Sequence, residues 1–223
     1  MDVTVYTAIT AGKDGLRDDQ FTDGADFIAY LDDTPPTEVW QVRRACNLFH
    51  HPNRNAKIHK VLAHQYLEDA QYSIWLDGNI ALKTPAMRLV DQFLAGYDLA
   101  MFSHPERDCL YEEAAFSCFW EVADVHEMEE QVAEYRRQGF PALAGMVECG
   151  VIVRRHTPQV ERFNEIWWSE ICRRSYQDQL SVMVAARKAG VEINRIPGSI
   201  QNVPHLSPRR LGNPFVDCRN HFK

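Results

Sequence analysis

The stretch that decides the fold is Gln71-Tyr72-Ser73-Ile74-Trp75-Leu76-Asp77-Gly78-Asn79-Ile80-Ala81-Leu82. Its first half has the β-branched and aromatic character of a strand buried on both faces, which is typical of a parallel sheet. Asp77-Gly78-Asn79 then stops the apolar run, because Asp-Gly is a turn signal that a buried strand tolerates only at its end. Asp77 is therefore expected at the carboxyl end of a strand, where ligands bind in open α/β sheets.

Asp77 and Asn79 can both direct a side-chain oxygen at a hard divalent cation, since only one glycine separates them. The pattern favours metal and phosphate chemistry. The alternative is a tight turn with no further role, because Asp, Gly and Asn are all favoured turn residues. Asp77-Gly78-Asn79 alone does not distinguish a metal site from a simple turn.

The composition is that of an ordinary globular domain. The chain has 223 residues, of which 45% are hydrophobic and 25% charged, and we predict one domain over residues 1–223. The net charge of −7 argues against duplex nucleic acid as a partner. No apolar run reaches the roughly 20 residues of a membrane span, and the N-terminus lacks the basic start of a secretion signal, so a cytoplasmic protein is expected. The six cysteines form no Cys-x-x-Cys pair, which excludes a zinc ribbon or a redox motif of that type.

Strands and helices alternate along the chain, and polar loops follow several of the predicted strands. The pattern predicts strands over residues 3–9, 26–31, 98–102, 145–154 and 192–196, besides the stretch above. It predicts helices over residues 55–70, 85–94 and 121–138, one carrying Phe163 to Ile171, and one ending at Ala189. Such alternation indicates an α/β fold with a mostly parallel central sheet flanked by helices. The polar loops would then share one ligand-binding edge.

The predicted helix over residues 55–70 has basic residues near its beginning: Arg54, Lys57 and Lys60. Cations at this end oppose the helix dipole. The arrangement is explained if the helix start faces an anion such as a pyrophosphate. A solvated basic surface is the alternative.

Two further acids are candidates for a site. Glu148 is the only acid in the apolar strand over residues 145–154, and a carboxylate there is costly unless it is paired or functional. Asp178 precedes the helix that ends at Ala189. The common use of Asp at such a place is to cap the helix, and that reading stays open.

Several motifs together resemble a known family. They are Ile-Trp-Leu-Asp-Gly-Asn (residues 74–79), Ser-His-Pro-Glu-Arg-Asp-Cys-Leu-Tyr-Glu-Glu-Ala (103–114), Glu-Cys-Gly-Val-Ile-Val-Arg (148–154) and Asp-Gln-Leu-Ser (178–181). They are similar to the glycosyltransferase-like domain family found in plant pectin and mucilage biosynthesis proteins and in bacterial relatives. The resemblance spans nearly the whole chain and implies a GT-A fold, which is Rossmann-like. Asp77 and Asn79 stand where the family has a metal-binding Asp-x-Asp type motif, with Asn79 lacking the charge.

The resemblance further implies a glycosyltransferase. The donor would be a nucleoside-diphosphate sugar, with UDP favoured, and the acceptor a saccharide hydroxyl; Mn²⁺ or Mg²⁺ would assist. A late histidine, His205 or His221, would add to the metal. Asp178 and Gln179 are similar to the Asp-Gln pair of retaining GT-A enzymes, so retention is expected. We predict catalytic roles for Asp178, Gln179 and Glu148, and a donor pocket that contains Thr7, Asp33, Arg54, Lys57, His104, Arg107 and Glu112.

Two other functions are compatible with parts of the sequence. A nucleotidyltransferase acting on sugar phosphates would also use an α/β sheet and a metal carboxylate, but the chain has no Gly-x-x-x-x-Gly-Lys loop. A noncatalytic carbohydrate-binding domain would use exposed aromatics such as Trp120, Trp167 and Trp168, which are more typical of a core. The donor sugar, the acceptor and the oligomeric state stay open.

Overall fold

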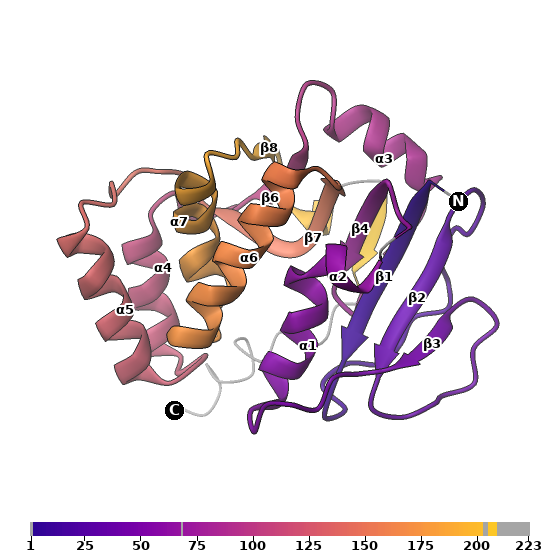
Figure 1. Cartoon of the computed structure of the whole chain (residues 1–223), viewed down its shortest axis with the longest axis horizontal. Helices are drawn as coiled ribbons and strands as arrows, with labels where there is room; N and C mark the ends of the chain where they lie inside the picture. The colour runs from indigo at the N-terminus through magenta and orange to yellow at the C-terminus, as the bar shows by residue number, and fades with distance from the viewer. Residues whose placement is uncertain (1, 68, 203–204, 209–223) are drawn as a thin grey trace, which may run out of the picture.

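The computed structural model of the chain describes residues 2–67, 69–202 and 205–208. A central sheet has the strand order β3-β2-β1-β4-β7-β6-β8, with helices on both faces (Figure 1). Its strands are β1 (Val3–Ile9), β2 (Asp26–Leu31), β3 (Gln41–Arg44), β4 (Tyr72–Leu76), β6 (Leu99–Ser103), β7 (Val147–Arg155) and β8 (Asn194–Ile196). A small second sheet pairs β5 (Ile80–Leu82) with β9 (Leu206–Pro208). The predicted α/β fold with a mostly parallel sheet is confirmed.

One strand of the central sheet is reversed. β7 runs antiparallel to both of its neighbours, β4 and β6, whereas the other paired strands run parallel. β7 therefore begins at the edge where β4 and β6 end. Directly after β4, the N–H of Asp77 donates to the carbonyl of Gly150 at 2.9 Å. The reversal thus places residues 148–150 beside Asp77.

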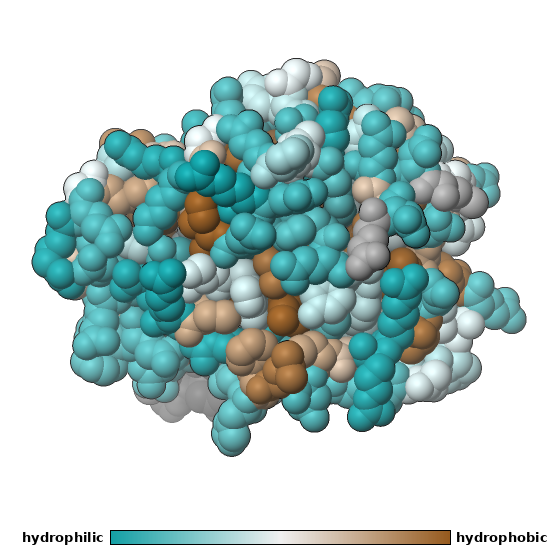
Figure 2. Space-filling model, viewed as in Figure 1, coloured by the Kyte–Doolittle hydropathy of each residue, from teal (hydrophilic) through white to brown (hydrophobic). Residues whose placement is uncertain are grey.

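The helices on the two faces bury different sides of the strands. α1 (Pro52–Val61), α2 (Ala63–Tyr66), α6 (Pro158–Arg173) and α7 (Gln179–Ala189) cover one face, and α3 (Ala86–Phe93) covers the other. In β1 the alternation is clear, because Val5 packs with the residues of α3 and Tyr6 packs with those of α6. α4 (Leu110–Phe119) and α5 (Val125–Arg137) pack beside α7 at one end of the sheet (Figure 1). The outer surface of the face that carries α1 and α6 is mainly hydrophilic (Figure 2).

A few elements differ from the prediction. The helix predicted over residues 55–70 is broken at Leu62, whose ψ of 42° ends α1 before α2 begins. The helix predicted over residues 121–138 begins at Val125, where the Asp124 side chain caps it by accepting from the Glu127 N–H. β3 and α4 were not predicted. β3 is a short edge strand whose single apolar residue is Val42, and the buried side of α4 includes the carboxylate of Glu113.

Candidate active site

A cavity of about 370 Å³ opens at the carboxyl edge of the sheet. The loop after β1, helix α1, the end of β4, the start of β7 and the start of α7 all contribute to its wall. Four residues that the sequence assigned to the site meet here, namely Lys57, Asp77, Asp178 and Gln179. Segments more than a hundred residues apart in the chain therefore converge at the edge where the strand pattern placed Asp77.

A network of charged side chains forms the floor of this cavity. Nζ of Lys60 lies 2.8 Å from Oδ2 of Asp178, an ion-pair contact rather than a well-directed hydrogen bond, and 3.3 Å from Oδ1 of Asp77. Nζ of Lys57 lies 2.9 Å from Oδ1 of Asp178. The side chains of Lys60 and Asp178 are each only 6% exposed. Lys60 was grouped with Arg54 and Lys57 in the sequence but not assigned to the site; its spacing of three residues from Lys57, which puts both on one helix face, was the available signal.

The network favours the charged forms of Lys60 and Asp178. Burial alone would lower the pKa of Lys60, but the carboxylates of Asp178 and Asp77 outweigh burial and raise that pKa well above its usual value. Burial alone would raise the pKa of Asp178, but Lys57 and Lys60 hold it below the usual range of a carboxyl group. Burial and the charge of Asp178 raise the pKa of the Cys149 thiol, which lines the same cavity. The cavity therefore presents fixed charges of both signs.

Two side-chain contacts hold Asp77 in place, besides its backbone hydrogen bonds. The indole Nε1 of Trp75 donates to its Oδ1 at 2.7 Å, and Lys60 donates to the same oxygen. A Cβ atom at Gly150 would lie 3.2 Å from its Oδ2, and a Cβ atom at Gly78 would lie 2.7 to 2.9 Å from Ile9 and Asp14 atoms. The two glycines therefore permit close approaches at the cavity wall, of Asp77 to Gly150 and of Ile9 and Asp14 to Gly78.

Asp14 is a third carboxylate of this cavity, besides Asp77 and Asp178, and the sequence did not single it out. Burial and the neighbouring charge of Asp77 raise the pKa of Asp14. Asp178 is paired with Lys57 and Lys60, whereas Asp14 and Asp77 fit a Mg²⁺ or Mn²⁺ ion that takes its remaining ligands from substrate phosphates and water, which is the usual mode for Mg²⁺. Among the described residues, no group of three or more His, Cys, Asp or Glu side chains stands close enough to form a complete protein cage.

The other residues predicted for the metal lie elsewhere. Asn79 is not among the residues that line the cavity, and its backbone carbonyl accepts from Nη1 of Arg17 at 3.3 Å. The carbonyl of His205 accepts from the Lys83 N–H at 2.8 Å, at the end of β5 farther from Asp77. His221 lies outside the described residues.

Arg54 binds the C-terminal end of α6, whereas Lys57 binds Asp178 in the cavity. Its Nη2 donates to the carbonyl of Arg174 at 2.7 Å and its Nε to the carbonyl of Ile171 at 3.4 Å, so it satisfies the C-terminal carbonyls of α6. It also stands 3.7 Å from the carboxylate of Glu127. Arg54 does not line the cavity, whereas Lys57 does.

Thr7 and Asp33 do not line the cavity. Thr7 lies within β1 with 1% of its surface exposed, and its hydroxyl has no hydrogen-bond partner among the described residues. Three residues on, Thr10 does line the cavity and donates to the carbonyl of Pro52 at 2.7 Å. Asp33 is exposed; its neighbour Asp32 accepts from the Ala11 N–H at 2.7 Å. Thr10 and Asp32, and not Thr7 and Asp33, therefore make the contacts that order the loop after β1.

His104 and Arg107 form a separate cluster with Glu113 at the end of β6. Arg107 Nε donates to Oε2 of Glu113 at 2.5 Å, and Arg107 Nη2 lies 3.1 Å from His104 Nε2. Burial lowers the pKa of His104, against the opposing effect of Glu113. Glu112, the predicted residue, is exposed, whereas its neighbour Glu113 is buried. None of these described residues lines the cavity.

Glu148 lies on the other face of β7 from the charged network. Its neighbours Val147 and Cys149 pack on the face covered by α6 and α7, and Glu148 points the other way. Its carboxylate accepts from the Ile200 N–H at 3.0 Å and lies 3.5 Å from the Ser199 hydroxyl. Burial raises its pKa. The structure thus gives Glu148 a contact with the turn that follows β8.

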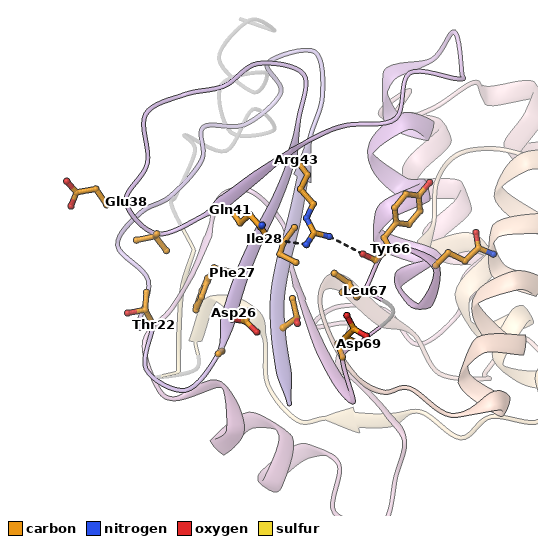
Figure 3. A pocket seen from close by; sticks show the side chains of 15 residues that line it. Thr22, Asp26, Phe27, Ile28, Glu38, Gln41, Arg43, Tyr66, Leu67 and Asp69 are labelled. Carbon is orange, nitrogen blue, oxygen red and sulfur yellow. Dashed lines mark hydrogen bonds between the residues drawn. The ribbon is translucent and has the colours of Figure 1, made fainter. Parts of the chain in front are cut away.

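A second hollow, of about 1100 Å³, lies at the opposite, amino edge of the sheet (Figure 3). Residues at the starts of β1, β2 and β3 line it, and Arg43 donates to the carbonyl of Tyr66 at 3.4 Å across one side. None of the described residues that the sequence singled out lies there. The cavity at the carboxyl edge is therefore the candidate site.

Two plant proteins are similar in sequence to this chain. The chain is 27% identical over 175 residues to a protein of Arabidopsis thaliana named probable hexosyltransferase MUCI70, covering 74% of this chain and 30% of that protein. It is 26% identical over 154 residues to alkaline ceramidase TOD1 of the same plant, covering 64% of this chain and 33% of that protein. The chain thus spans about a third of the length of these two relatives.

A solved structure shows the same fold. The apo structure of the bifunctional glycosyltransferase WbbM matches with a TM-score of 0.50 and 9% identity, over 87% of this chain and 38% of that chain. At this identity the likeness concerns the fold, which is the GT-A fold expected from the sequence. No helix of the described residues is long and apolar enough to cross a membrane. A family model, the TOD1/MUCI70 glycosyltransferase-like domain, matches residues 28–196, and the chain belongs to this family.

Proposed function

We propose that the chain transfers a sugar from a nucleoside-diphosphate donor to a hydroxyl of a saccharide acceptor. The observation that carries this proposal is the network of Lys57, Lys60, Asp178 and Asp77 at the carboxyl edge of a GT-A sheet. A nucleotide sugar has an anionic diphosphate beside a hydroxyl-rich ring. A cavity with ammonium and carboxylate groups side by side offers partners to both parts.

Lysine side chains are suited to the diphosphate. Lys13 and Lys57 line the cavity, and burial together with the charge of Lys57 lowers the pKa of Lys13. A diphosphate between the two ammonium groups would relieve their repulsion and gain two charge-assisted contacts. Lys60 is more deeply buried, and its role would be to hold the carboxylates of Asp77 and Asp178 at fixed positions.

Asp178 and Gln179 are suited to the sugar. An ionised carboxylate only accepts hydrogen bonds, so Asp178 would accept from sugar hydroxyls while Lys57 and Lys60 balance its charge. The amide Nε2 of Gln179 donates to the carbonyl of Val147 at 3.2 Å, which orients the amide at the cavity wall. Both residues come from the start of α7, a rigid element, and rigid elements position a substrate best.

Asp77 and Asp14 would hold a Mg²⁺ or Mn²⁺ ion together with the donor phosphates, and such an ion neutralises charge on the departing diphosphate. Asp77 suits this role because Lys60 and Trp75 occupy its Oδ1, whereas Oδ2 accepts no hydrogen bond that the described residues donate. The UDP form of the donor remains our expectation from the family resemblance.

The low basicity of Asp178 favours retention of configuration. An inverting enzyme needs a general base for the acceptor hydroxyl, and a carboxyl group whose pKa is held below its usual range is a weak base. Glu148, whose pKa is raised, lies on the other face of β7. In a retaining reaction the leaving phosphate takes the proton of the acceptor hydroxyl, so that no protein base is required.

The test is the melting temperature with nucleotides. UDP or GDP with Mn²⁺, at 100 times its dissociation constant, should stabilise the protein by about 2.7 kcal/mol. For a chain of this size that corresponds to a rise of roughly 5 to 11 °C. The control is Lys57→Ala, which should reduce the shift because it removes a diphosphate contact.

Three outcomes would contradict the proposal. If no nucleoside diphosphate at millimolar concentration shifts the melting temperature, the protein does not bind the proposed donor. A shift with nucleoside triphosphates only would favour a nucleotidyltransferase. Release of fatty acid from ceramide, without any sugar transfer, would instead give this chain the activity named for its second relative.

A further inference from the structure

Tyr6 of β1 lies behind two residues that line the candidate active site, Lys60 and Trp75. It is 0% exposed and does not line the cavity itself. Its hydroxyl donates to the backbone carbonyl of Lys60 at 3.0 Å and accepts from Nη1 of Arg154 at 2.6 Å. Its ring packs against the Trp75 indole at an interplanar angle of 72°, with 5.2 Å between the ring centroids. Tyr6 thus joins α1, β4 and β7.

The two cavity residues that Tyr6 contacts are the two that hold Asp77. Nζ of Lys60 lies 3.3 Å from Oδ1 of Asp77, and Nε1 of Trp75 donates to the same oxygen at 2.7 Å. Tyr6 fixes the main chain that carries Lys60, because the Lys60 carbonyl is among the last four of α1 and such carbonyls have no partner within the helix. Its ring also limits how far the Trp75 indole can tilt. Both contacts of Oδ1 therefore depend on Tyr6.

Arg154 is a costly neighbour for a tyrosine that would serve only to fill the core. It is 0% exposed, and among the described residues its Nε and Nη2 have no hydrogen-bond partner. A guanidinium that is buried with so little compensation destabilises a fold. Its contact does give direction: since Nη1 of Arg154 donates to the Tyr6 oxygen, the Tyr6 proton points at the Lys60 carbonyl. Packing alone gives no reason for this donor, whereas positioning of the hydroxyl does.

We propose that Tyr6 is a positioning residue for the metal-binding carboxylate of Asp77, an inference that rests on the proposed function. The Tyr6 hydroxyl fixes the last turn of α1. The Lys60 ammonium and the Trp75 indole then stay on Oδ1 of Asp77 and leave its Oδ2 to a Mg²⁺ or Mn²⁺ ion. Residues that orient a metal ligand change the metal affinity without touching the metal.

The experiment measures Mn²⁺ binding to the whole chain by the electron paramagnetic resonance signal of the free ion, with and without UDP. Tyr6→Phe keeps the ring and removes the hydroxyl. Tyr30→Phe is the matched control, because Tyr30 of β2 is 4% exposed and makes the same two kinds of hydrogen bond. Its hydroxyl donates to the carbonyl of Tyr66 at 2.9 Å and accepts from Nη1 of Arg43 at 3.4 Å. None of its described hydrogen bonds or ring contacts reaches the residues around Asp77.

We expect Tyr6→Phe to weaken Mn²⁺ binding about tenfold, at the low end of the effect of residues that orient a metal ligand. Tyr30→Phe should bind Mn²⁺ as the wild type does, although both variants lose buried hydrogen bonds and should unfold at lower urea concentration. A double variant, Tyr6→Phe with Arg154→Met, removes the donor that Tyr6→Phe leaves without an acceptor. It should be more stable than Tyr6→Phe and bind Mn²⁺ equally weakly, so it decides the question if Tyr6→Phe does not fold.

Three results would overturn the inference. One is an unchanged Mn²⁺ affinity in Tyr6→Phe and in the double variant. Another is an equal loss in Tyr30→Phe, which would make the effect one of general stability. The third is a wild type that binds no Mn²⁺ with or without UDP, because Asp77 would then hold no metal.

The proposed function fails in a different way. If UDP neither binds nor tightens Mn²⁺ binding, while the affinity for Mn²⁺ alone still depends on Tyr6, the proposed donor is wrong and the positioning role of Tyr6 stands.

Discussion

Replacing Lys60 with Met tests whether the charged floor of the cavity is as buried as the structure shows. Met keeps most of the length of the side chain and removes only the ammonium. Removing one partner of a buried ion pair costs about 3 to 5 kcal/mol, because the remaining charge is left uncompensated. Asp178 keeps Lys57 at 2.9 Å, and Asp77 keeps the Trp75 indole at 2.7 Å. We therefore expect a loss near the lower end, about 3 kcal/mol, or roughly 6 to 12 °C in melting temperature.

The pH dependence of this loss follows from the direction of the two pKa shifts. The raised pKa of Lys60 gives stability that is fully present below its unfolded value, about 10.4, and lost only as pH rises through the folded value. The lowered pKa of Asp178 gives stability that is present above its unfolded value, about 3.9, and lost as pH falls through the folded value. Between about pH 5 and pH 9 the difference between Lys60→Met and wild type should be constant.

The assay is urea unfolding at pH 5, 7 and 9, with Lys83→Met as the matched control. Lys83 also pairs with an aspartate, Asp19, at 2.7 Å, but the two side chains are 34% and 54% exposed. An exposed pair contributes less than about 1 kcal/mol. If Lys60→Met costs no more than Lys83→Met, the network is solvated and its role as a rigid floor is refuted.

Two more predictions compare neighbouring residues with different surroundings. Lys57→Ala should weaken nucleotide affinity, whereas Arg54→Ala should leave that affinity unchanged. Arg54→Ala should instead lower the free energy of unfolding, because the carbonyls at the end of α6 lose their donor. Calorimetry with UDP measures the affinity and urea unfolding measures the stability; equal nucleotide affinities of the two variants would contradict this assignment. Glu113→Gln should destabilise the fold by about 3 kcal/mol because it breaks a buried ion pair, whereas Glu112→Gln should stay within about 0.5 kcal/mol in the same urea assay; the reverse order would show that the buried face of α4 is wrongly placed.

The edge that holds the candidate site was predictable from local signals. The apolar run before Asp77 ends abruptly, and a strand of that kind ends at a ligand-binding edge. Asp178 stands at the start of α7, so this edge collects it once the strands are parallel. Lys57 was expected near the start of a helix, but α1 begins at Pro52, so Lys57 reaches the cavity from the middle of that helix and Lys60 from its last turn. What the sequence could not give is their pairing, because a contact between residues 57 and 178 depends on how α1 and α7 pack on the sheet.

The residues that were wrongly assigned share one physical cause: the direction of a strand and the rotation of a helix cannot be read from the sequence. β7 has the composition of a parallel strand, and nothing in it reports that it runs antiparallel to β4. The face to which Glu148 points could therefore not be assigned. The rotation of a helix or the end of a strand likewise decides between adjacent acids, so Glu113 and Asp32 make the contacts that were expected near Glu112 and Asp33.

The central claim is that the protein turns over a nucleotide sugar in this cavity and that Asp77 is required as a metal ligand. The most direct measurement is release of nucleoside diphosphate from UDP- and GDP-sugars against Mn²⁺ concentration, for wild type, Asp77→Asn and Asn79→Asp. We expect Asp77→Asn to lose at least about 100-fold, on the order of 2.7 kcal/mol in the barrier, because the charge on the metal ligand is gone. Asn79→Asp should stay close to wild type, since residue 79 does not line the cavity. An Asp77→Asn protein with wild-type turnover and metal dependence would contradict the account.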